Sequence, residues 1–173
     1  MIKSGTQNTK NWYSNNIYNN LIKLCNDSQD VWLSAKILQT SDGFVYADVP
    51  NSIFNAFLPL LNDEPGVSKP PKNERHFDDV GAHISVIKSR EIKENNIIFN
   101  DIGRTIHYKM LGVRQVENPD GWEEIEKVWF IAVESPDLEQ LRTKYGLSPR
   151  IKDHLFHITL AVKPRMITDQ YFT

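Results

Sequence analysis

Alternating apolar and polar residues divide most of the chain into short strands. Two β-rich runs, residues 31–40 and 44–49, flank a Ser-Asp-Gly turn in which Gly43 can adopt the positive φ that tight hairpins need. We therefore expect a β-hairpin at this point. The other expected strands cover residues 82–87, 96–101, 104–116, 126–135 and 154–163.

Helices are predicted where apolar residues recur at helical spacing. The clearest one begins at Ser135, a suitable N-cap, has Pro136 at its first helical position, and ends at Gly146. The remaining expected segments are short helices at 10–26, 53–61 and 88–95, a long loop rich in proline and charge at 62–80, and a flexible start at 1–10.

The order of these segments favours an α+β fold. Strands occur as hairpins or alternate irregularly with helices, and neither a βαβ repeat nor any other fixed-period repeat occurs. Mainly antiparallel sheets are therefore expected. A length of 173 residues suits one domain, which we take to be the whole chain, 1–173.

Composition narrows the possible function classes. The chain is 40% hydrophobic and 24% charged with a formal net charge of −2, so it lacks the basic excess of proteins that coat duplex nucleic acid. No apolar run approaches the ~20 residues of a membrane span, and the one cysteine, Cys25, cannot form an internal disulfide. We expect a cytoplasmic monomer that binds neither membranes nor bulk duplex nucleic acid, with Cys25 as a buried small hydrophobe.

Common catalytic signatures are missing, but one short pattern occurs twice. The sequence has no P-loop, no dinucleotide-binding glycine motif, no nucleophile elbow and no HExxH helix. Residues 83–86 (HISV) and 157–160 (HITL) both read His, apolar, Ser or Thr, apolar, and both lie inside expected strands. Composition alone predicts roughly 0.1 such matches among the five histidines, so two are not expected by chance.

Strand geometry gives the repeated pattern a chemical meaning. Side chains two positions apart lie on the same face of a strand, about 6.6 Å apart along it. His83 and Ser85 therefore share one face of their strand, and His157 and Thr159 share one face of theirs, while the residues between them enter the core. If the two strands are neighbours, two imidazoles and two hydroxyls converge.

Two imidazoles and two hydroxyls suit a displacement at phosphorus. Because the ordinary pKa of histidine is about 6.5, one ring can be neutral and the other protonated at neutral pH. The neutral ring would accept a proton from the attacking hydroxyl or water, and the protonated ring would donate one to the leaving oxygen. The hydroxyls would bind the non-bridging oxygens, and the reaction would require no metal or other cofactor.

The paired motifs resemble those of the two-histidine (2H) phosphoesterase superfamily, which includes RNA cyclic phosphodiesterases and 2′,5′-phosphodiesterases. The resemblance rests on both motifs, on their separation of 74 residues and on the β-rich order around them. It implies a bilobal α+β fold in which two mainly antiparallel sheets flank a central cleft, with helices outside. It also implies that His83 and His157 are catalytic and that Ser85 and Thr159 bind phosphate. The implied substrate is a small nucleotide or oligonucleotide with a 2′,3′-cyclic phosphate, a 2′-5′ linkage or a cyclic backbone.

Five other side chains are candidates for contact with this substrate. Cations and imidazoles could bind phosphate, and aromatic rings could stack on a base. For each of the five, a solvated surface position or partial burial is the alternative interpretation. They are Lys36 and Tyr46 on the expected hairpin, Arg75 and His76 in the long loop, and Trp122 after an Asn-Pro-Asp-Gly turn.

Two other function classes stay open at this point. The same site could bind a phosphorylated ligand or nucleotide without turnover, or the chain could be an interaction protein whose histidines are incidental. Geometry separates these classes. Both ligand-binding hypotheses require the two imidazoles to face a common space, and both fail if the rings lie on opposite faces of the fold.

Overall fold

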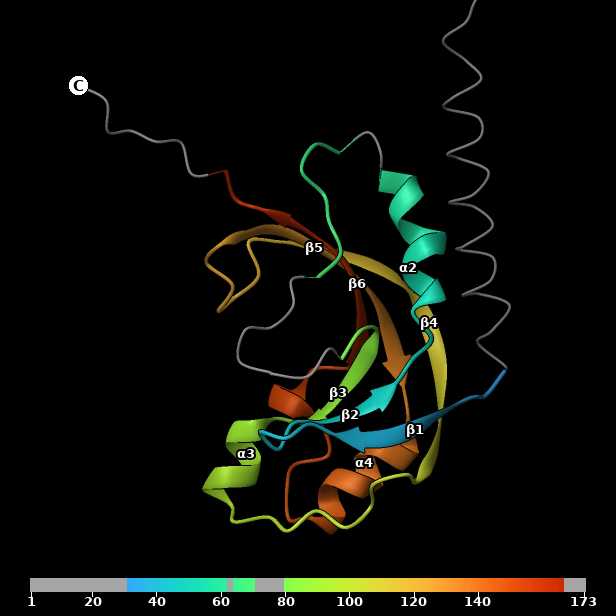
Figure 1. The fold of residues 1–173 in the computed structure, drawn as a ribbon, viewed down its shortest axis with the longest axis vertical. Helices are drawn as coiled ribbons and strands as arrows, with labels where there is room; N and C mark the ends of the chain where they lie inside the picture. Colours follow the sequence, from blue (N-terminus) through green and yellow to red (C-terminus); the bar gives the residue numbers. More distant parts are fainter. Residues whose placement is uncertain (1–30, 62–63, 71–79, 167–173) are drawn as a thin grey trace, which may run out of the picture.

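The computed structural model describes residues 31–61, 64–70 and 80–166, and strands dominate them (Figure 1). The strands are β1 (Leu33–Gln39), β2 (Val45–Asp48), β3 (His83–Ile87), β4 (Thr105–Glu117), β5 (Ile125–Glu134) and β6 (Phe156–Pro164). The helices are α2 (Ser52–Phe57), α3 (Ser89–Glu94) and α4 (Pro136–Lys144), with 3₁₀ segments η2 (Leu58–Leu61) and η3 (Ile151–Asp153).

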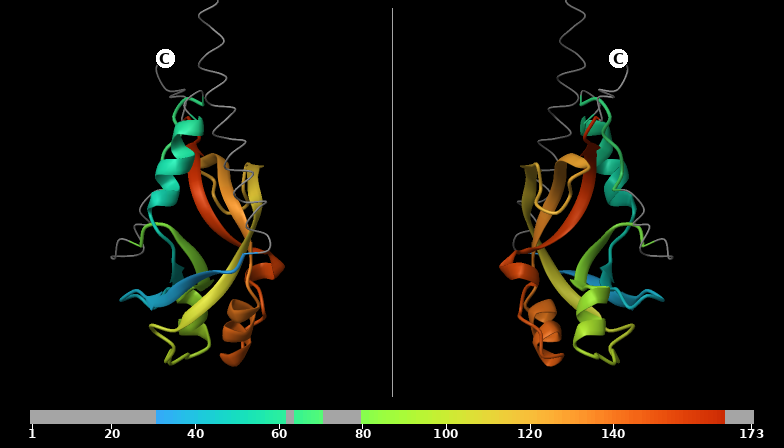
Figure 2. Two further views of the ribbon diagram at one scale, coloured as in Figure 1. Left: turned by 90° about the vertical axis from the view of Figure 1, so that its right-hand side faces the viewer. Right: turned by 90° about the vertical axis from the view of Figure 1, so that its left-hand side faces the viewer.

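These strands form one closed ring in the order β1-β2-β3-β6-β5-β4, and every neighbouring pair is antiparallel. β1, β2 and β3 make one half of the ring and β4, β5 and β6 make the other (Figure 2). The halves are joined where β3 pairs with β6 and where β1 pairs with β4. The expected α+β class with antiparallel pairing is confirmed, and the two expected sheets are the two halves of this ring. Each half contributes one motif strand.

The β1–β2 hairpin forms as the sequence predicts. Gly43 has a φ of 96°, and the Thr40 N–H donates to the Phe44 carbonyl at 2.9 Å. The Phe44 N–H donates in return to the Thr40 hydroxyl at 3.0 Å. This turn aligns Tyr46 with Leu38 and so sets the register at the start of the ring.

One face of the ring is apolar and carries the core. Its centre is a row of residues that pair with one another across five neighbouring strands: Ile37, Ala47, Ile84, Ile158 and Ile131. All five are only 0–1% exposed. Their burial fixes the register, because a slip of one residue would turn a strand's apolar side chains to the opposite face. The residues that alternate with this row face the other way, and they include both motif histidines.

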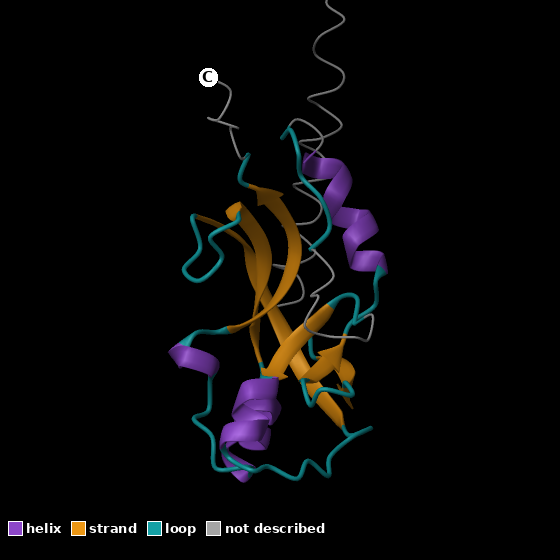
Figure 3. Cartoon of the chain, turned by 60° about the vertical axis from the view of Figure 1, so that its left-hand side comes forward, coloured by secondary structure: helices purple, strands orange, loops and turns teal. Residues whose placement is uncertain are grey.

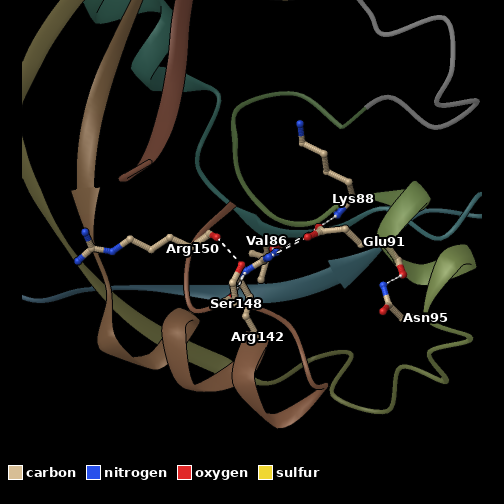
Figure 4. Close-up of polar contacts among 7 residues, drawn as sticks. All are labelled: Val86, Lys88, Glu91, Asn95, Arg142, Ser148 and Arg150. Carbon is tan, nitrogen blue, oxygen red and sulfur yellow. Dashed lines mark hydrogen bonds and ion pairs between the residues drawn. The ribbon is translucent and has the colours of Figure 1, made fainter. Parts of the chain in front are cut away.

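Helix α4 lies at the opposite end of the strands from α2 (Figure 3) and begins as predicted, with the Ser135 hydroxyl accepting from the Leu138 N–H at 3.2 Å. Near its end is a buried arginine that sequence analysis did not single out. The Arg142 guanidinium, 1% exposed, donates to the Val86 carbonyl at 2.7 Å and to both carboxylate oxygens of Glu91 at 2.8 and 3.1 Å (Figure 4). These bonds tie α4 and α3 to the end of strand β3.

The prediction of a strand at residues 96–101 was wrong. The segment is an irregular connection between α3 and β4. Asn96 has a φ of 51°, and the Ile97 N–H donates back to the Ile92 carbonyl at 3.0 Å. Ile97 and Phe99 pack against the core without strand pairing, Phe99 against Tyr145 at a ring-centroid distance of 5.0 Å, whereas Ile98 between them is 79% exposed. The apolar run that predicted a strand therefore reflects packing of single side chains.

The long segment before β3 is partly ordered by pairing. Ser68 forms an isolated antiparallel bridge with Val162 of β6, with both N–H to carbonyl distances at 3.0 Å. No helix in the described segments is long and apolar enough to cross a membrane. The helix expected at 10–26, the flexible start at 1–10 and Cys25 lie outside the described residues.

Candidate active site

Pairing of β3 with β6 brings the two motifs together. Their central isoleucines, Ile84 and Ile158, are directly paired in an antiparallel register. One residue to either side, this register sets the other motif residues in two opposed pairs, Ser85 with His157 and His83 with Thr159. Opposed side chains in such a pair are about 5 Å apart and diagonal ones about 7–8 Å apart. The two histidines therefore lie diagonally across the strand pair.

All four polar side chains share one face of this strand pair. Ile84 and Ile158 are 0% exposed on the core side. His157 is exposed, and the other three polar motif residues are half-buried. Because side chains alternate along a strand, the histidines and hydroxyls face away from the core together. An incidental pair of histidines could lie on opposite faces of the fold. These two rings lie on the same face.

Each histidine is anchored to the backbone two residues before it. His83 Nδ1 lies 2.8 Å from the Gly81 carbonyl oxygen, and the His157 ring is hydrogen-bonded to the Leu155 backbone. A carbonyl oxygen only accepts, so Nδ1 of His83 donates and carries a proton. Nε2 is then the nitrogen of His83 that gains or loses a proton. The two halves of the ring thus repeat the same local arrangement.

The anchor of His83 requires glycine at position 81. Gly81 has a φ of 63°, and a Cβ there would collide with the Asn51 side-chain oxygen. That oxygen accepts from the Ala82 N–H at 2.8 Å and so holds the start of β3 in place. A side chain at position 81 would displace Asn51 and shift the carbonyl that binds His83.

Burial lowers the pKa of His157 below its ordinary value of 6.5. Positive charge on His83 and Lys88 lowers this pKa further, against the opposing effect of the Leu155 hydrogen bond. Part of the His157 surface reaches solvent, yet Phe130 packs edge-on against the imidazole at a centroid distance of 5.4 Å. His157 is therefore neutral at pH 7.

Aromatic rings also pack against His83. Phe44 and Tyr46 stack on each other at 5.7 Å and meet the imidazole edge-on at 5.5 and 5.9 Å between ring centroids. Tyr46 is buried and pairs with Ser85 across the β2–β3 register. Of the predicted substrate contacts that the structure describes, Tyr46 is the one that lies beside a motif histidine.

The other predicted contacts are not gathered at the histidines. Lys36 donates to a threonine hydroxyl of β4 at 2.7 Å, on the side of the ring where β1 meets β4. Trp122 is 42% exposed and lies in the β4–β5 turn, before the start of β5. The part of β5 that pairs with the second motif lies several residues further along the chain. Arg75 and His76 lie outside the described residues.

Asp48 and Phe130, which lie on this face, were among the residues that sequence analysis missed. Asp48 pairs with His83, and Phe130 pairs with Thr159 and packs against His157. Both lie on strands that neighbour the motif strands. Their position beside the motifs depends on the register between strands that are distant in sequence. The alternation of residues within one strand shows which residues of that strand share a face, but not which residues of other strands lie next to them.

The described residues form no evident metal centre. Protein metal sites usually combine three or more His, Cys, Asp or Glu ligands. In the part of the chain that the structure describes, no such group of three is placed to hold a metal ion.

Comparison with known proteins agrees with this geometry. A family model described as 2H-SAK, Swiss Army Knife, 2H phosphoesterase domain, matches residues 46–168, a span that contains both motifs. No curated protein and no solved structure matches the chain.

Proposed function

Because the chain belongs to the 2H phosphoesterase superfamily and is in general terms a phosphoesterase, we propose that it is a metal-independent phosphodiesterase acting on nucleotides. Its substrate would be a 2′,3′-cyclic phosphate, a 2′-5′ linkage or a cyclic oligonucleotide. The observation that supports this most is the β3–β6 register, since it sets two imidazoles and two hydroxyls on one face. The proposal includes a cytoplasmic monomer acting on small nucleotides.

In this proposal the two histidines have different roles. His157 is neutral at pH 7 because its pKa is lowered, so it is the base that accepts a proton from water or from a substrate hydroxyl. Burial disfavours a proton on His157, and positive charge on His83 disfavours it further, so we assign the acid role to His83. His83 then donates its proton to the leaving oxygen.

Bond making and bond breaking balance across this pair. The nucleophile's oxygen forms a bond to phosphorus as its proton passes to His157, and the bond from phosphorus to the leaving oxygen breaks as that oxygen takes the proton of His83. Attack by water gives a phosphomonoester, and attack by a neighbouring 2′-hydroxyl gives a cyclic phosphate. The diagonal of about 7–8 Å between the histidine positions is wide enough for a phosphate to lie between the rings.

Ser85 and Thr159 supply hydrogen bonds to the non-bridging oxygens. Each lies two residues after a histidine on the same strand face and opposite the other histidine across the β3–β6 pair. Neutral hydroxyl donors stabilise charge that builds on these oxygens as the phosphorus becomes five-coordinate. The two donors approach from different strands, and this fixes the orientation of the phosphate between the rings.

A nucleotide panel tests the proposal. The purified protein is incubated with EDTA and with 2′,3′-cyclic mononucleotides, 2′-5′-linked dinucleotides and cyclic dinucleotides, and the products are identified by mass spectrometry. We expect turnover of at least one class and loss of about 100-fold or more in the His83→Ala and His157→Ala variants. His107→Ala is the matched control, because His107 is exposed on β4 and bonded to Asp137. Nucleotide binding without any product would favour a binding module instead.

A further inference from the structure

Arg114 on β4 differs from the other arginines of the described segments. Five of those arginines have a carboxylate or amide partner: Arg90, Arg104, Arg142, Arg150 and Arg165. Arg114 has no hydrogen bond or ion pair within the described segments, and it is exposed. An arginine with no protein partner can bind an anionic group without breaking an existing contact.

Strand register places Arg114 at the level of the motif residues. Arg114 pairs with Phe130 across β4 and β5, and Phe130 pairs with Thr159 across β5 and β6. Two strand spacings separate the backbones of Arg114 and Thr159, or about 10 Å. The guanidinium and the phosphate-binding hydroxyl therefore belong to one row across three strands.

Side-chain contacts show which face this row occupies. The Phe130 ring packs on His157, so Phe130 points to the motif face. Arg114 is its direct partner and points the same way, whereas Val113, the residue before it, packs against the core. The Arg114 guanidinium consequently lies on the histidine face of the ring, beyond Phe130.

A neighbouring row carries small residues on this side of the site. His157 pairs with Ala132, and Ala132 pairs with Gly112. A Cβ added at Gly112 would meet nothing within 4 Å. The row next to His157 thus consists of small residues, of which Ala132 is fully buried and Gly112 has open space beside it, and Phe130 and Arg114 lie along one side of this row.

We propose that Arg114 binds a second phosphate of the substrate, one nucleoside away from the phosphodiester that is cleaved. This inference rests on the proposed function, because it takes the two histidines as the place of the first phosphate. Phe130 then lies beside the sugar or base that links the two phosphates. The preferred substrates are nucleotides with an additional phosphate, such as a 5′-phosphorylated cyclic nucleotide or an oligonucleotide, rather than a cyclic mononucleotide with one phosphate.

Matched pairs of compounds test this directly. Adenosine 2′,3′-cyclic phosphate is compared with its 5′-phosphorylated form, and 2′-5′-linked diadenylate with its 5′-phosphorylated form. For the wild type we expect kcat/KM to be about tenfold or more higher for the phosphorylated member, the effect of one charge-assisted hydrogen bond. Arg114→Gln should reduce this ratio to about one. Arg90→Gln, which removes an exposed arginine paired with Glu94 on α3, should keep the wild-type ratio.

The readouts separate this inference from the proposed function. Equal ratios in the wild type and Arg114→Gln, with turnover of both compounds, would overturn the role of Arg114 and leave the phosphodiesterase intact. If no compound is cleaved, the proposed function fails, and dissociation constants for the same pairs decide the inference. A tenfold preference for the phosphorylated member that disappears in Arg114→Gln would support it. Equal affinities, or no binding of either member, would overturn it.

Discussion

Ile84 and Ile158 face each other across β3 and β6, and both side chains are fully buried. Their pairing joins the two halves of the ring. It also sets the positions of the histidines, because each histidine is the residue immediately before one of these isoleucines. The same hydrophobic contact therefore stabilises the fold and aligns the two motif histidines.

We expect Ile158→Ala to destabilise the protein by about 2–5 kcal/mol and Ile158→Val by about 1 kcal/mol, because methyl groups are removed from a closely packed core. Ile98→Ala is the control, since Ile98 is 79% exposed, and its effect should stay within about 0.5 kcal/mol. Urea denaturation of the three variants measures these differences. Equal stability of Ile158→Ala and the wild type would mean that the two halves of the ring do not pack at this pair.

Gly81→Ala should reduce kcat by about tenfold or more, because it displaces the carbonyl that orients His83. Gly66→Ala is the matched control, since Gly66 also has a positive φ, of 77°, but a Cβ there meets nothing within 4 Å. Gly66→Ala should lose about 1–2 kcal/mol of stability from backbone strain. Gly81→Ala should lose more than this, because its Cβ also displaces Asn51, and it alone should lose activity as well. Comparable activity in the two variants would remove the orienting role of Gly81.

The lowered pKa of His157 predicts how activity depends on pH. Catalysis needs this ring to be neutral, so the rate should rise with pH as His157 loses its proton, at a pKa below 6.5. By pH 7 this rise should be complete. Phe130→Ala exposes the ring to water and should raise the pKa toward 6.5, which moves the acidic limb to higher pH. NMR titration of His157 together with the pH dependence of kcat measures both effects. Trp122→Ala is the control, and a His157 pKa at or above 6.5 in the wild type would contradict the assignment of His157 as base.

Arg142→Met should destabilise the protein by about 3 kcal/mol, because Glu91 and two backbone carbonyls lose a buried partner. Burial raises the pKa of Glu91, but hydrogen bonds from Arg142 and the Lys88 backbone outweigh it and leave the pKa below 4.5. The contribution of the pair is therefore complete above pH 4.5 and is lost as the pH falls through the lowered pKa. The difference between the variant and the wild type, measured by denaturation, should shrink in acid.

Arg90→Met is the control for this pair, because the Arg90–Glu94 ion pair is largely exposed. Its effect on stability should stay below about 0.5 kcal/mol. A loss in Arg90→Met as large as that in Arg142→Met would show that burial does not distinguish the two arginines.

Local patterns in the sequence predicted most of the strands and identified the two motifs that the structure brings together. Gly43 marked the first hairpin, Ser135 and Pro136 marked the start of α4, and the two motifs marked β3 and β6. These features depend on residues close together in the chain, such as a turn glycine or a cap. The run at 96–101 is not a strand: Ile97 and Phe99 pack individually against the core while Ile98 is exposed, and the spacing of apolar residues alone does not distinguish this from strand pairing.

Those local patterns could not predict contacts between segments that are distant in sequence. Phe130 and Arg114 reach the motif face through two successive registers, and Arg142 reaches Val86 across 56 residues of sequence. From the sequence, a single arginine in a helix is expected to lie on the surface, because arginine is rarely fully buried without partners. Only the fold shows that carbonyls and a carboxylate surround it.

Cooperation between His83 and His157 on one phosphodiester is tested most directly by a double-mutant cycle on kcat in the presence of EDTA. Each single alanine variant should lose about 100- to 10,000-fold, and the double variant should lose little more than either single one, because neither histidine works without the other. Full activity in either single variant, or activity that appears only with added metal, would contradict the proposed mechanism.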